Sequence, residues 1–232
     1  MPPSAVHAVR FKRASDRSLL VYFGEQITLA AHEQVRKLLH LLALEPISGI
    51  RNLQPAYCSV LVKFDPLRLE HEELESAITL YLGRLESIKL PGSRHVEIPV
   101  CYGGEYGPDL DDVSALQTLT REKAIELHTA TTYLVYFLGF VPGFAYLGDV
   151  PAALAISRLP TPRKTVPPGS VGIAGNQTAV YPFATPGGWR LIGRTPLAMF
   201  RPDRPDLSLL AIGDRVRFVP ISPERFTILE NA

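Results

Sequence analysis

Hydrophobic residues in the first 88 positions follow two different spacings. Four short segments have the composition of strands: residues 6–12, 18–23, 50–53 and 59–64. Two longer segments repeat apolar residues at helical spacing. One lies between Thr28, a suitable N-cap, and Pro46, and the other follows Asp65-Pro66 and continues to Leu85. The order strand, strand, helix, strand, strand, helix predicts an α+β domain over residues 1–88. It resembles a ferredoxin-like sandwich with both helices on one face of the sheet.

The pattern changes after residue 88. Residues 90–93 (Leu-Pro-Gly-Ser) have the composition of a linker, and residues 95–100 have that of a strand. Asp109 and Thr120 are candidate N-caps of two short helices, and from Thr132 the chain is almost entirely strand and turn. The candidate strands there are residues 133–138, 171–173, 179–181, 190–192, 198–200, 207–210 and 216–219. Many short strands at close spacing predict a β-barrel or a β-sandwich over residues 94–232.

Composition excludes several classes of function. Lys and Arg total 24 against 23 Asp and Glu, so there is no electrostatic case for binding nucleic acid or an anionic membrane. Apolar runs such as residues 38–44 are too short to span a bilayer, and Arg10 and its basic neighbours interrupt any N-terminal signal segment. Cys58 and Cys101 form no metal or redox motif, which favours reduced thiols. We therefore expect a cytoplasmic protein.

Motifs of several familiar chemistries are absent from the chain. No segment matches the P-loop pattern, and Gly169, Gly172 and Gly175 lack the spacing of the dinucleotide fingerprint. The six histidines stand in no zinc motif, and Ser170 is not part of a nucleophile elbow. The sequence therefore predicts no protein-ligated metal, and motifs alone do not name a reaction.

Glycine, proline and aromatic residues concentrate between Phe137 and Arg201. Glycine permits backbone conformations that other residues resist, and proline fixes φ while removing a hydrogen-bond donor. The aromatic and β-branched residues in the same stretch favour short strands rather than disorder. This mixture predicts strands joined by shaped turns, with backbone N–H groups and aromatic faces available to a ligand. We expect the functional site here.

The same stretch closely resembles the family of 5-oxoprolinase B subunits, also called the KipI family or the family of the first allophanate hydrolase subunit. The similarity is carried by residues 137–147, Pro162-Arg163, 166–175 and 185–189, and it extends over about residues 98–219. The segment from residue 152 to 160 is shorter than the usual pattern. The resemblance implies an N-terminal α+β domain followed by a cyclophilin-like β-barrel domain. It also implies two partners, the C subunit (KipA-like), which has a related barrel, and the A subunit.

Three activities are described for such proteins. Together with the A and C subunits they open 5-oxoproline to glutamate at the expense of ATP, which, with or without Mg²⁺, would be held by the complex. Some members instead bind and inhibit a sporulation histidine kinase, and a related pair within urea carboxylase serves carboxyl transfer. The intact glycine-rich and arginine-bearing loops favour the enzyme, because a kinase inhibitor needs only a surface.

Opening a stable lactam requires stabilisation of a substrate carboxylate and of a transferring phosphoryl group. Arg163 and Arg194 are candidate anion ligands, with structural salt bridges as the alternative. His128 is a candidate for proton transfer or a structural histidine, and Gln177 could orient a carbonyl or phosphate or satisfy a turn. The candidate substrate- or nucleotide-binding residues are Phe144, Tyr146, Gly169, Ser170, Gly175, Thr178, Tyr181, Gly188 and Trp189. Core packing is the alternative for the aromatic residues, above all for Phe140.

Overall fold

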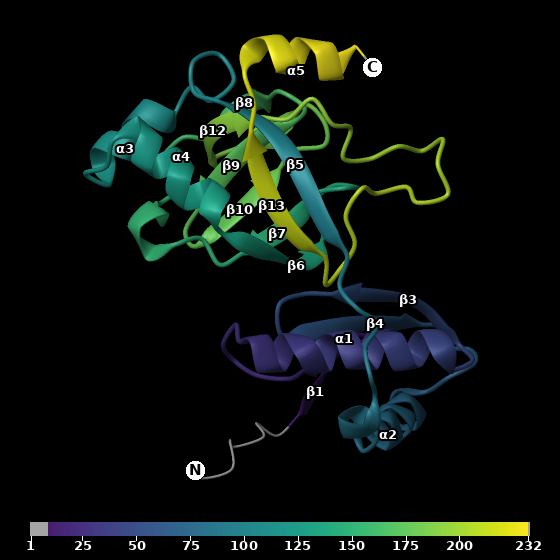
Figure 1. The fold of residues 1–232 in the computed structure, drawn as a ribbon. Coiled ribbons are helices and arrows are strands. Elements are labelled where there is room, and N and C mark those ends of the chain that lie inside the picture. Colours follow the sequence, from purple (N-terminus) through teal and green to yellow (C-terminus); the bar gives the residue numbers. More distant parts are fainter. Residues whose placement is uncertain (1–8, 232) are drawn as a thin grey trace. The chain divides into compact units, whose positions relative to one another are not determined.

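The computed structural model describes residues 9–231 and divides the chain into two compact units, Met1–Gly92 and Ser93–Ala232 (Figure 1). Each unit has a hydrophobic core of its own. The first predicted strand, residues 6–12, falls partly outside the described residues, because residues 6–8 are not among them. Within residues 9–231, no helix has the length and apolar character needed to cross a membrane.

The N-terminal unit follows the predicted order of elements. They are β1 (Arg10–Ser15), β2 (Ser18–Tyr22), α1 (Leu29–Leu44), β3 (Ile50–Pro55), β4 (Ser59–Phe64), α2 (His71–Leu82) and the short 3-10 helix η1 (Leu85–Ser87). The strands form an antiparallel sheet in the order β1-β2-β4-β3. Thr28 caps α1 as predicted, since its hydroxyl accepts a hydrogen bond from the Ala31 N–H at 3.1 Å. The ferredoxin-like designation stays a prediction. The ferredoxin-like fold has the order βαββαβ, whereas this unit has the order ββαββα.

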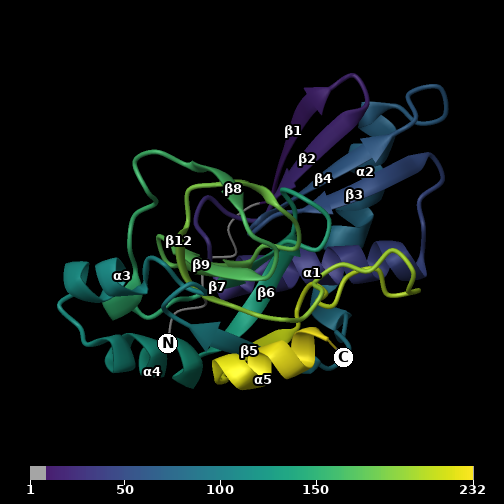
Figure 2. The same ribbon diagram turned by 90° about the horizontal axis from the view of Figure 1, so that it is seen from above.

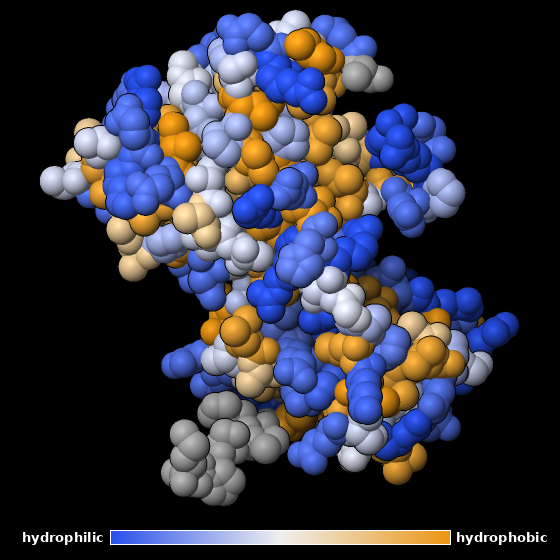
Figure 3. Space-filling view, in the orientation of Figure 1, coloured by the Kyte–Doolittle hydropathy of each residue, from blue (hydrophilic) through white to orange (hydrophobic). Residues whose placement is uncertain are grey.

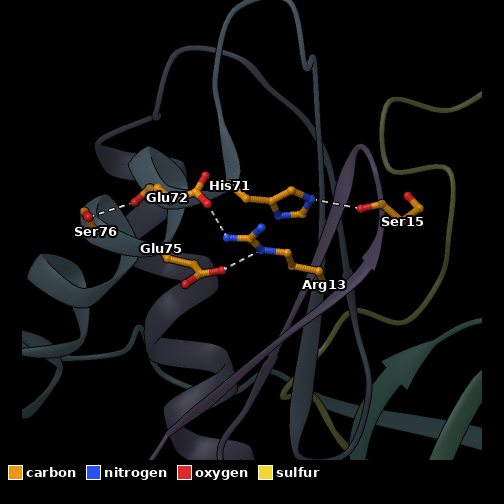
Figure 4. Close-up of polar contacts among 6 residues, drawn as sticks. All are labelled: Arg13, Ser15, His71, Glu72, Glu75 and Ser76. Atoms are coloured by element: carbon orange, nitrogen blue, oxygen red, sulfur yellow. Dashed lines mark hydrogen bonds and ion pairs between the residues drawn. The ribbon is translucent and has the colours of Figure 1, made fainter.

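Both helices of this unit cover one face of the sheet. Alternate residues of the two central strands, among them Leu19, Val21, Val60 and Val62, are fully buried in one cluster with apolar residues of α1 and α2. A polar link also joins β1 to α2 (Figure 4). The Arg13 guanidinium donates to Glu72 at 2.5 Å and lowers the pKa of that carboxyl group. This ion pair is exposed, and such surface pairs contribute little to stability.

The second unit is a barrel with additional helices. Its elements are β5 (His95–Tyr102), α3 (Leu110–Leu116), α4 (Arg121–Ala130), β6 (Thr132–Leu138), β7 (Ala145–Gly148), η2 (Ala152–Leu154), β8 (Arg163–Val166), β9 (Ser170–Ala174), β10 (Gln177–Val180), β11 (Thr185–Gly187), β12 (Arg190–Arg194), β13 (Arg215–Pro220) and α5 (Pro223–Glu230). Seven strands close in the order β10-β7-β6-β13-β5-β12-β9, and β8 and β11 form a separate two-stranded ribbon. The structure therefore selects the barrel over the sandwich.

Side chains from all seven strands of the barrel meet in its interior and form the main core. Helices α3 and α4 lie side by side against the barrel in both ribbon views (Figures 1 and 2) and add Leu110, Val113 and Ala124 to this core. A second cluster combines Val166 of the ribbon with residues from the opposite face of the barrel strands. The face of the molecule seen in Figure 3 mixes hydrophilic residues with apolar patches in both units. Because the main core and this second cluster lie on opposite faces of the same strands, the barrel wall is buried on both faces where the ribbon covers it.

Two strands predicted in this unit do not form, and three observed strands and one α-helix were not predicted. Residues 198–200 and 207–210 form no strands and meet only in a bridge between Phe200 and Ser208, because two prolines interrupt the intervening loop and lack the N–H that a ladder needs. The strands β7, β8 and β11 were not predicted and have at most four residues each. Helix α5 was also missed, although Ser222 before Pro223 is a clear start signal.

The two candidate caps in this unit behave differently. Thr120 caps α4 as predicted, with its hydroxyl 3.1 Å from the Lys123 nitrogen. Asp109 stands before α3, but its carboxylate makes no capping hydrogen bond. It binds the Leu191 N–H and the Arg163 guanidinium instead. The aspartate predicted as an N-cap therefore joins the start of α3 to the barrel wall instead.

Candidate functional site

A cavity of about 220 Å³ lies on the outer face of the barrel wall, beneath the residues of the ribbon. Its lining consists of Phe140, Phe144, Tyr146, Arg158, Pro162, Tyr181, Pro186, Gly187, Gly188 and Trp189. Successive residues of a strand point to opposite faces, so Tyr146 turns outward while its neighbours Ala145 and Leu147 join the main core. We call this cavity the outer pocket. It contains five of the thirteen predicted site residues.

Aromatic rings build the outer pocket around Phe144. The Phe144 ring is 5.0 Å from Tyr146, 5.2 Å from Tyr181 and 5.7 Å from Trp189, and every pair is arranged edge to face. Phe144 is only 2% exposed and forms the floor. Phe140 is 61% exposed, so the packing alternative for Phe140 was wrong. Its φ of 70° is unusual for a bulky residue and holds its ring 5.4 Å from Phe144.

Gly187, the first of the two glycines before Trp189, is required by the shape of this pocket, whereas a Cβ at Gly188 would meet nothing closer than 3.6 Å. A Cβ atom at Gly187 would stand 2.4 Å from the Tyr181 hydroxyl oxygen, so any side chain there would displace the tyrosine. Burial raises the pKa of Tyr181, whose hydroxyl is hydrogen-bonded to the Trp189 backbone. Tyr181 is therefore neutral near pH 7 and serves as a positioned wall.

Arg158 is the one guanidinium among the residues that line the outer pocket, and the sequence patterns did not single it out. Its charged group lies over the Trp189 ring, 5.9 Å from the centroid. The residue belongs to the shortened segment between η2 and β8, where no motif marks it. A basic residue placed close before Pro160 and Pro162 is the only sequence signal that could have drawn attention to it.

Arg163 borders the outer pocket but is already engaged. Its guanidinium donates to the Asp109 carboxylate at 2.5 Å and to the Trp189 carbonyl oxygen at 3.5 Å. The other Asp109 oxygen accepts a hydrogen bond from the Leu191 N–H at 2.6 Å. Because Asp109 is 4% exposed, this is a buried tie between α3, β8 and β12. The geometry favours the structural alternative for Arg163.

Arg194 lies at the far end of β12 from Trp189 and does not reach the outer pocket. Its Nε donates to the Pro168 carbonyl oxygen at 2.8 Å, and its charge lies over the Phe226 ring of α5. Gly169 and Ser170 are found at this same end. Gly169 has a φ of +78°, and a Cβ there would stand 2.2 Å from the Thr195 carbonyl oxygen. Arg194 therefore fastens the barrel to α5, and Gly169 and Ser170 shape the turn beside it.

His128 and Thr178 form a closed network on the inner face of the wall. His128 is fully buried, with Nδ1 2.7 Å from the Tyr102 hydroxyl and Nε2 3.1 Å from the Thr178 hydroxyl. Thr178 donates its proton to the Gly172 carbonyl oxygen, so Nε2 carries the histidine proton and Nδ1 accepts from Tyr102. Burial lowers the pKa of His128 to about 3. The ring is neutral and sealed, which favours the structural alternative over proton transfer.

Gly175 and Gln177 belong to the hairpin between β9 and β10. Gly175, with a φ of +59°, and Asn176 make the two-residue turn that the pairing of Ala174 with Gln177 closes. Gly175 also exchanges backbone hydrogen bonds with Ile156. Neither predicted residue lines the outer pocket. Across residues 9–231, no cluster of three or more acidic, histidine or cysteine side chains has an arrangement suited to a metal ion.

Comparisons with known proteins agree on one family. Residues 9–210 match the family model described as the carboxyltransferase domain, subdomain C and D. The 5-oxoprolinase B subunit of Bacillus subtilis (strain 168) is 40% identical over 231 residues, which cover 94% of this chain and 95% of that protein. The 5-oxoprolinase B subunit of Escherichia coli O157:H7 is 44% identical over 84% of this chain and 88% of its own length.

A solved structure extends the likeness to the fold. The crystal structure of TTHA0988 superimposes with a TM-score of 0.79 and 37% identity over 89% of this chain. This chain spans 40% of the length of TTHA0988. The similarity in sequence and in fold therefore includes both units of the described chain. The chain belongs to the carboxyltransferase subdomain C and D family and, within it, to the family of 5-oxoprolinase B subunits.

Proposed function

We propose that this protein is the B subunit of an ATP-dependent 5-oxoprolinase and that it acts with the A and C subunits to open 5-oxoproline to glutamate. The observation that carries the proposal is the 40–44% identity with two proteins that bear this name, over most of their length and of this chain. The outer pocket supplies a place for the substrate, since it is small, aromatic and bordered by a guanidinium.

The chemistry of lactam opening fits an aromatic pocket better than an acidic or metal-lined one. The substrate is a small ring with an apolar edge and one carboxylate, and aromatic faces such as Tyr146 and Trp189 bind such rings by contact and desolvation. Phosphorylation of the lactam oxygen by ATP would make the ring carbon a better electrophile. Water would then add to that carbon, the C–N bond would break as the nitrogen takes up a proton to become the amine of glutamate, and loss of phosphate would leave the new carboxylate. In this proposal the described residues bind and orient the lactam.

The outer pocket does not fit a complete ATP molecule. Its volume of about 220 Å³ is below the roughly 300–1,000 Å³ typical of pockets for drug-sized ligands. A triphosphate also needs several converging N–H donors or cations, whereas this lining holds a single guanidinium. We therefore place the nucleotide, with or without Mg²⁺, on surfaces to which the A and C subunits contribute.

We further propose that residues 1–88 form a ferredoxin-like domain and that residues 94–232 form a cyclophilin-like domain. The closed barrel of the second unit supports the latter designation. The cytoplasm is the proposed compartment, because ATP is supplied there and the two free cysteines would stay reduced.

Carboxyl transfer is the second candidate function. The matched family model is described as a carboxyltransferase domain, which favours this chemistry directly. It would require a partner with biotin carboxylase activity, since this chain has no biotinylation motif of its own and the carboxyl group would arrive on a biotin carried by that partner. A pocket that binds a small amide would serve either reaction, so the partners decide between them.

Co-expression with the A and C subunits tests the proposed function. The purified complex should release glutamate from 5-oxoproline only when ATP is present, and omission of any one of the three proteins should abolish the release. Tyr146→Ala in the outer pocket should lower kcat/KM about tenfold, because one aromatic wall is lost. Tyr106→Ala, which removes a ring packed on Phe226 away from that pocket, is the matched control. A folded complex without glutamate release would contradict the proposal, and biotin-dependent carboxylation of an amide would replace it.

A further inference from the structure

The outer pocket has one cationic group for an anionic ligand. Both arginines expected to bind anions are engaged elsewhere, Arg163 by Asp109 and Arg194 by Pro168 and Glu230. Arg158, in contrast, has no carboxylate partner among residues 9–231. It is exposed, and its guanidinium lies over the Trp189 ring. A guanidinium without a carboxylate partner at the edge of an aromatic cavity is a ready ligand for a planar anion.

Arg158 is held in position by its two neighbours. The Leu159 N–H donates to the Gly188 carbonyl oxygen at 2.7 Å, and the Ser157 carbonyl oxygen accepts from the Arg190 side chain at 3.2 Å. These two hydrogen bonds fasten the backbone on both sides of Arg158 to the residues that flank Trp189. The guanidinium is therefore presented to the pocket by a fixed segment, which reduces the entropy lost when it binds a ligand.

The charge of Arg158 is felt inside the outer pocket. Burial raises the pKa of the Tyr146 hydroxyl, and the Arg158 guanidinium acts on it in the opposite direction. Arg158 opposes the effect of burial on the pKa of Tyr181 in the same way. Two tyrosines of the outer pocket thus lie within the field of Arg158, to which Arg163 adds at Tyr181. An anion bound among these rings would face Arg158.

We propose that Arg158 determines specificity by binding the carboxylate of a small lactam whose ring lies against the aromatic lining of the outer pocket. This inference rests on the proposed function for the identity of the lactam as 5-oxoproline. A guanidinium can bind both oxygens of one carboxylate through two parallel hydrogen bonds. A lactam without the carboxylate would leave that group unpaired, so the pocket discriminates against neutral lactams.

Trp189 makes the inference testable in the full chain alone, because it is the only tryptophan of the protein. Titration with 5-oxoproline should give a saturable change in tryptophan emission. Arg158→Gln should weaken this binding about 10- to 100-fold, and Arg158→Lys should restore part of it as a point charge. The neutral analogue 2-pyrrolidinone should bind the wild type and Arg158→Gln equally weakly. Arg217→Gln, which removes an exposed arginine paired with Glu97, is the control for charge and should match the wild type.

The complex with the A and C subunits provides a second measurement. Arg158→Gln should raise KM for 5-oxoproline by a similar factor and leave KM for ATP unchanged. Identical titrations of the wild type and Arg158→Gln, including two flat ones, would overturn the inference, and so would a selective rise in KM for ATP. A wild-type complex that releases no glutamate would contradict the proposed function instead. In that case, an emission change that depends on both the carboxylate and Arg158 would still support the anion site.

Discussion

The two faces of one barrel wall differ sharply in how they use polar groups. On the inner face, His128 and Thr178 are buried and Tyr102 is partly buried, and the His128 ring is hydrogen-bonded to both hydroxyl groups. On the outer face, Tyr146 and Trp189 surround a cavity, and Arg158 above them has no carboxylate partner among the described residues. The inner face uses its donors and acceptors within the fold, whereas the outer face leaves a cation and several aromatic edges for a ligand.

This difference follows from the alternation of side chains along a strand. In β10 and the residue after it, Thr178 and Val180 point inward, and Ala179 and Tyr181 point outward. Neighbours in one motif therefore have opposite roles. A residue in this motif can line the outer pocket only when its side chain reaches the outer face.

The largest expected effect comes from Asp109→Ala, at the joint between α3 and the pocket wall. The change leaves the half-buried Arg163 guanidinium and the buried Leu191 N–H without their partner, and Asp109 itself is 4% exposed. Loss of one member of a buried pair costs about 3–5 kcal/mol. Urea unfolding of the barrel unit, followed by tryptophan emission, measures the loss.

Asp111→Ala is the matched control for that change. Asp111 also pairs with an arginine, Arg121, but both side chains are at least half exposed. Such surface pairs contribute roughly 0–1 kcal/mol. Equal losses for Asp109→Ala and Asp111→Ala would show that burial of the Asp109 pair has no energetic consequence.

His128→Ala is expected to have the next largest effect. It removes the ring that accepts from the buried Tyr102 hydroxyl and stacks 4.5 Å from Phe218, and it leaves a cavity between α4 and the barrel. A cavity together with an unsatisfied buried hydroxyl costs about 2–4 kcal/mol. The free energy of unfolding should fall, while the affinity of the folded protein for 5-oxoproline should not change. A selective loss of affinity without loss of stability would return His128 to the functional site.

Much of the fold was predictable because periodicity reports burial. The alternation of Val60, Val62 and Phe64 and the helical spacing after Thr28 each identify one buried face, and the structure confirms both elements. The density of short strands predicted a barrel or a sandwich, and the structure shows the barrel. The loop around Pro202 and Pro205 misled the prediction, because the flanking apolar residues have strand composition but no partner strand.

The site was less predictable, for a different physical reason. The motif residues Phe144, Tyr181 and Trp189 lie together, as the concentration of aromatic residues near turns predicted, and they both line the outer pocket and pack in one buried cluster. Which arginine faces that pocket depends on partners far away in the sequence. Asp109 is 54 residues from Arg163 and binds its guanidinium. Nothing near Arg158 in the sequence indicates that it has no such partner.

Gly187→Ala tests whether the shape of the outer face is as restrictive as its geometry indicates. The new Cβ would meet the Tyr181 hydroxyl oxygen at 2.4 Å, so the tyrosine must move into the cavity. We expect a loss of about 1–3 kcal/mol in stability and weaker binding of 5-oxoproline. Gly92→Ala, where a Cβ would meet nothing within 4 Å, is the control. Wild-type affinity in Gly187→Ala would show that Tyr181 does not shape the ligand site.

The smallest expected change is the loss of stability per pH unit that each buried histidine causes, and it can be compared between the two units. Burial lowers the pKa of His128 to about 3 and that of His32 in α1 to about 4, below the ordinary 6.5. Since the unfolded state takes up a proton that the folded state refuses, the stability from the neutral ring is fully present above pH 6.5. It is lost as the pH falls toward the folded pKa, by about 1.4 kcal/mol per pH unit for each histidine.

Single substitutions show in which unit each histidine makes the stability depend on pH. Urea unfolding at about pH 7, 6 and 5 should show a shallower pH dependence for the barrel unit in His128→Asn and for the N-terminal unit in His32→Asn. Each variant should leave the slope of the other unit unchanged, because the two rings lie in separate cores. If His128→Asn keeps the wild-type slope for the barrel unit, the histidine already takes up its proton in the folded state. The inner network would then be open to water, and the contrast between the two faces of the wall would no longer hold.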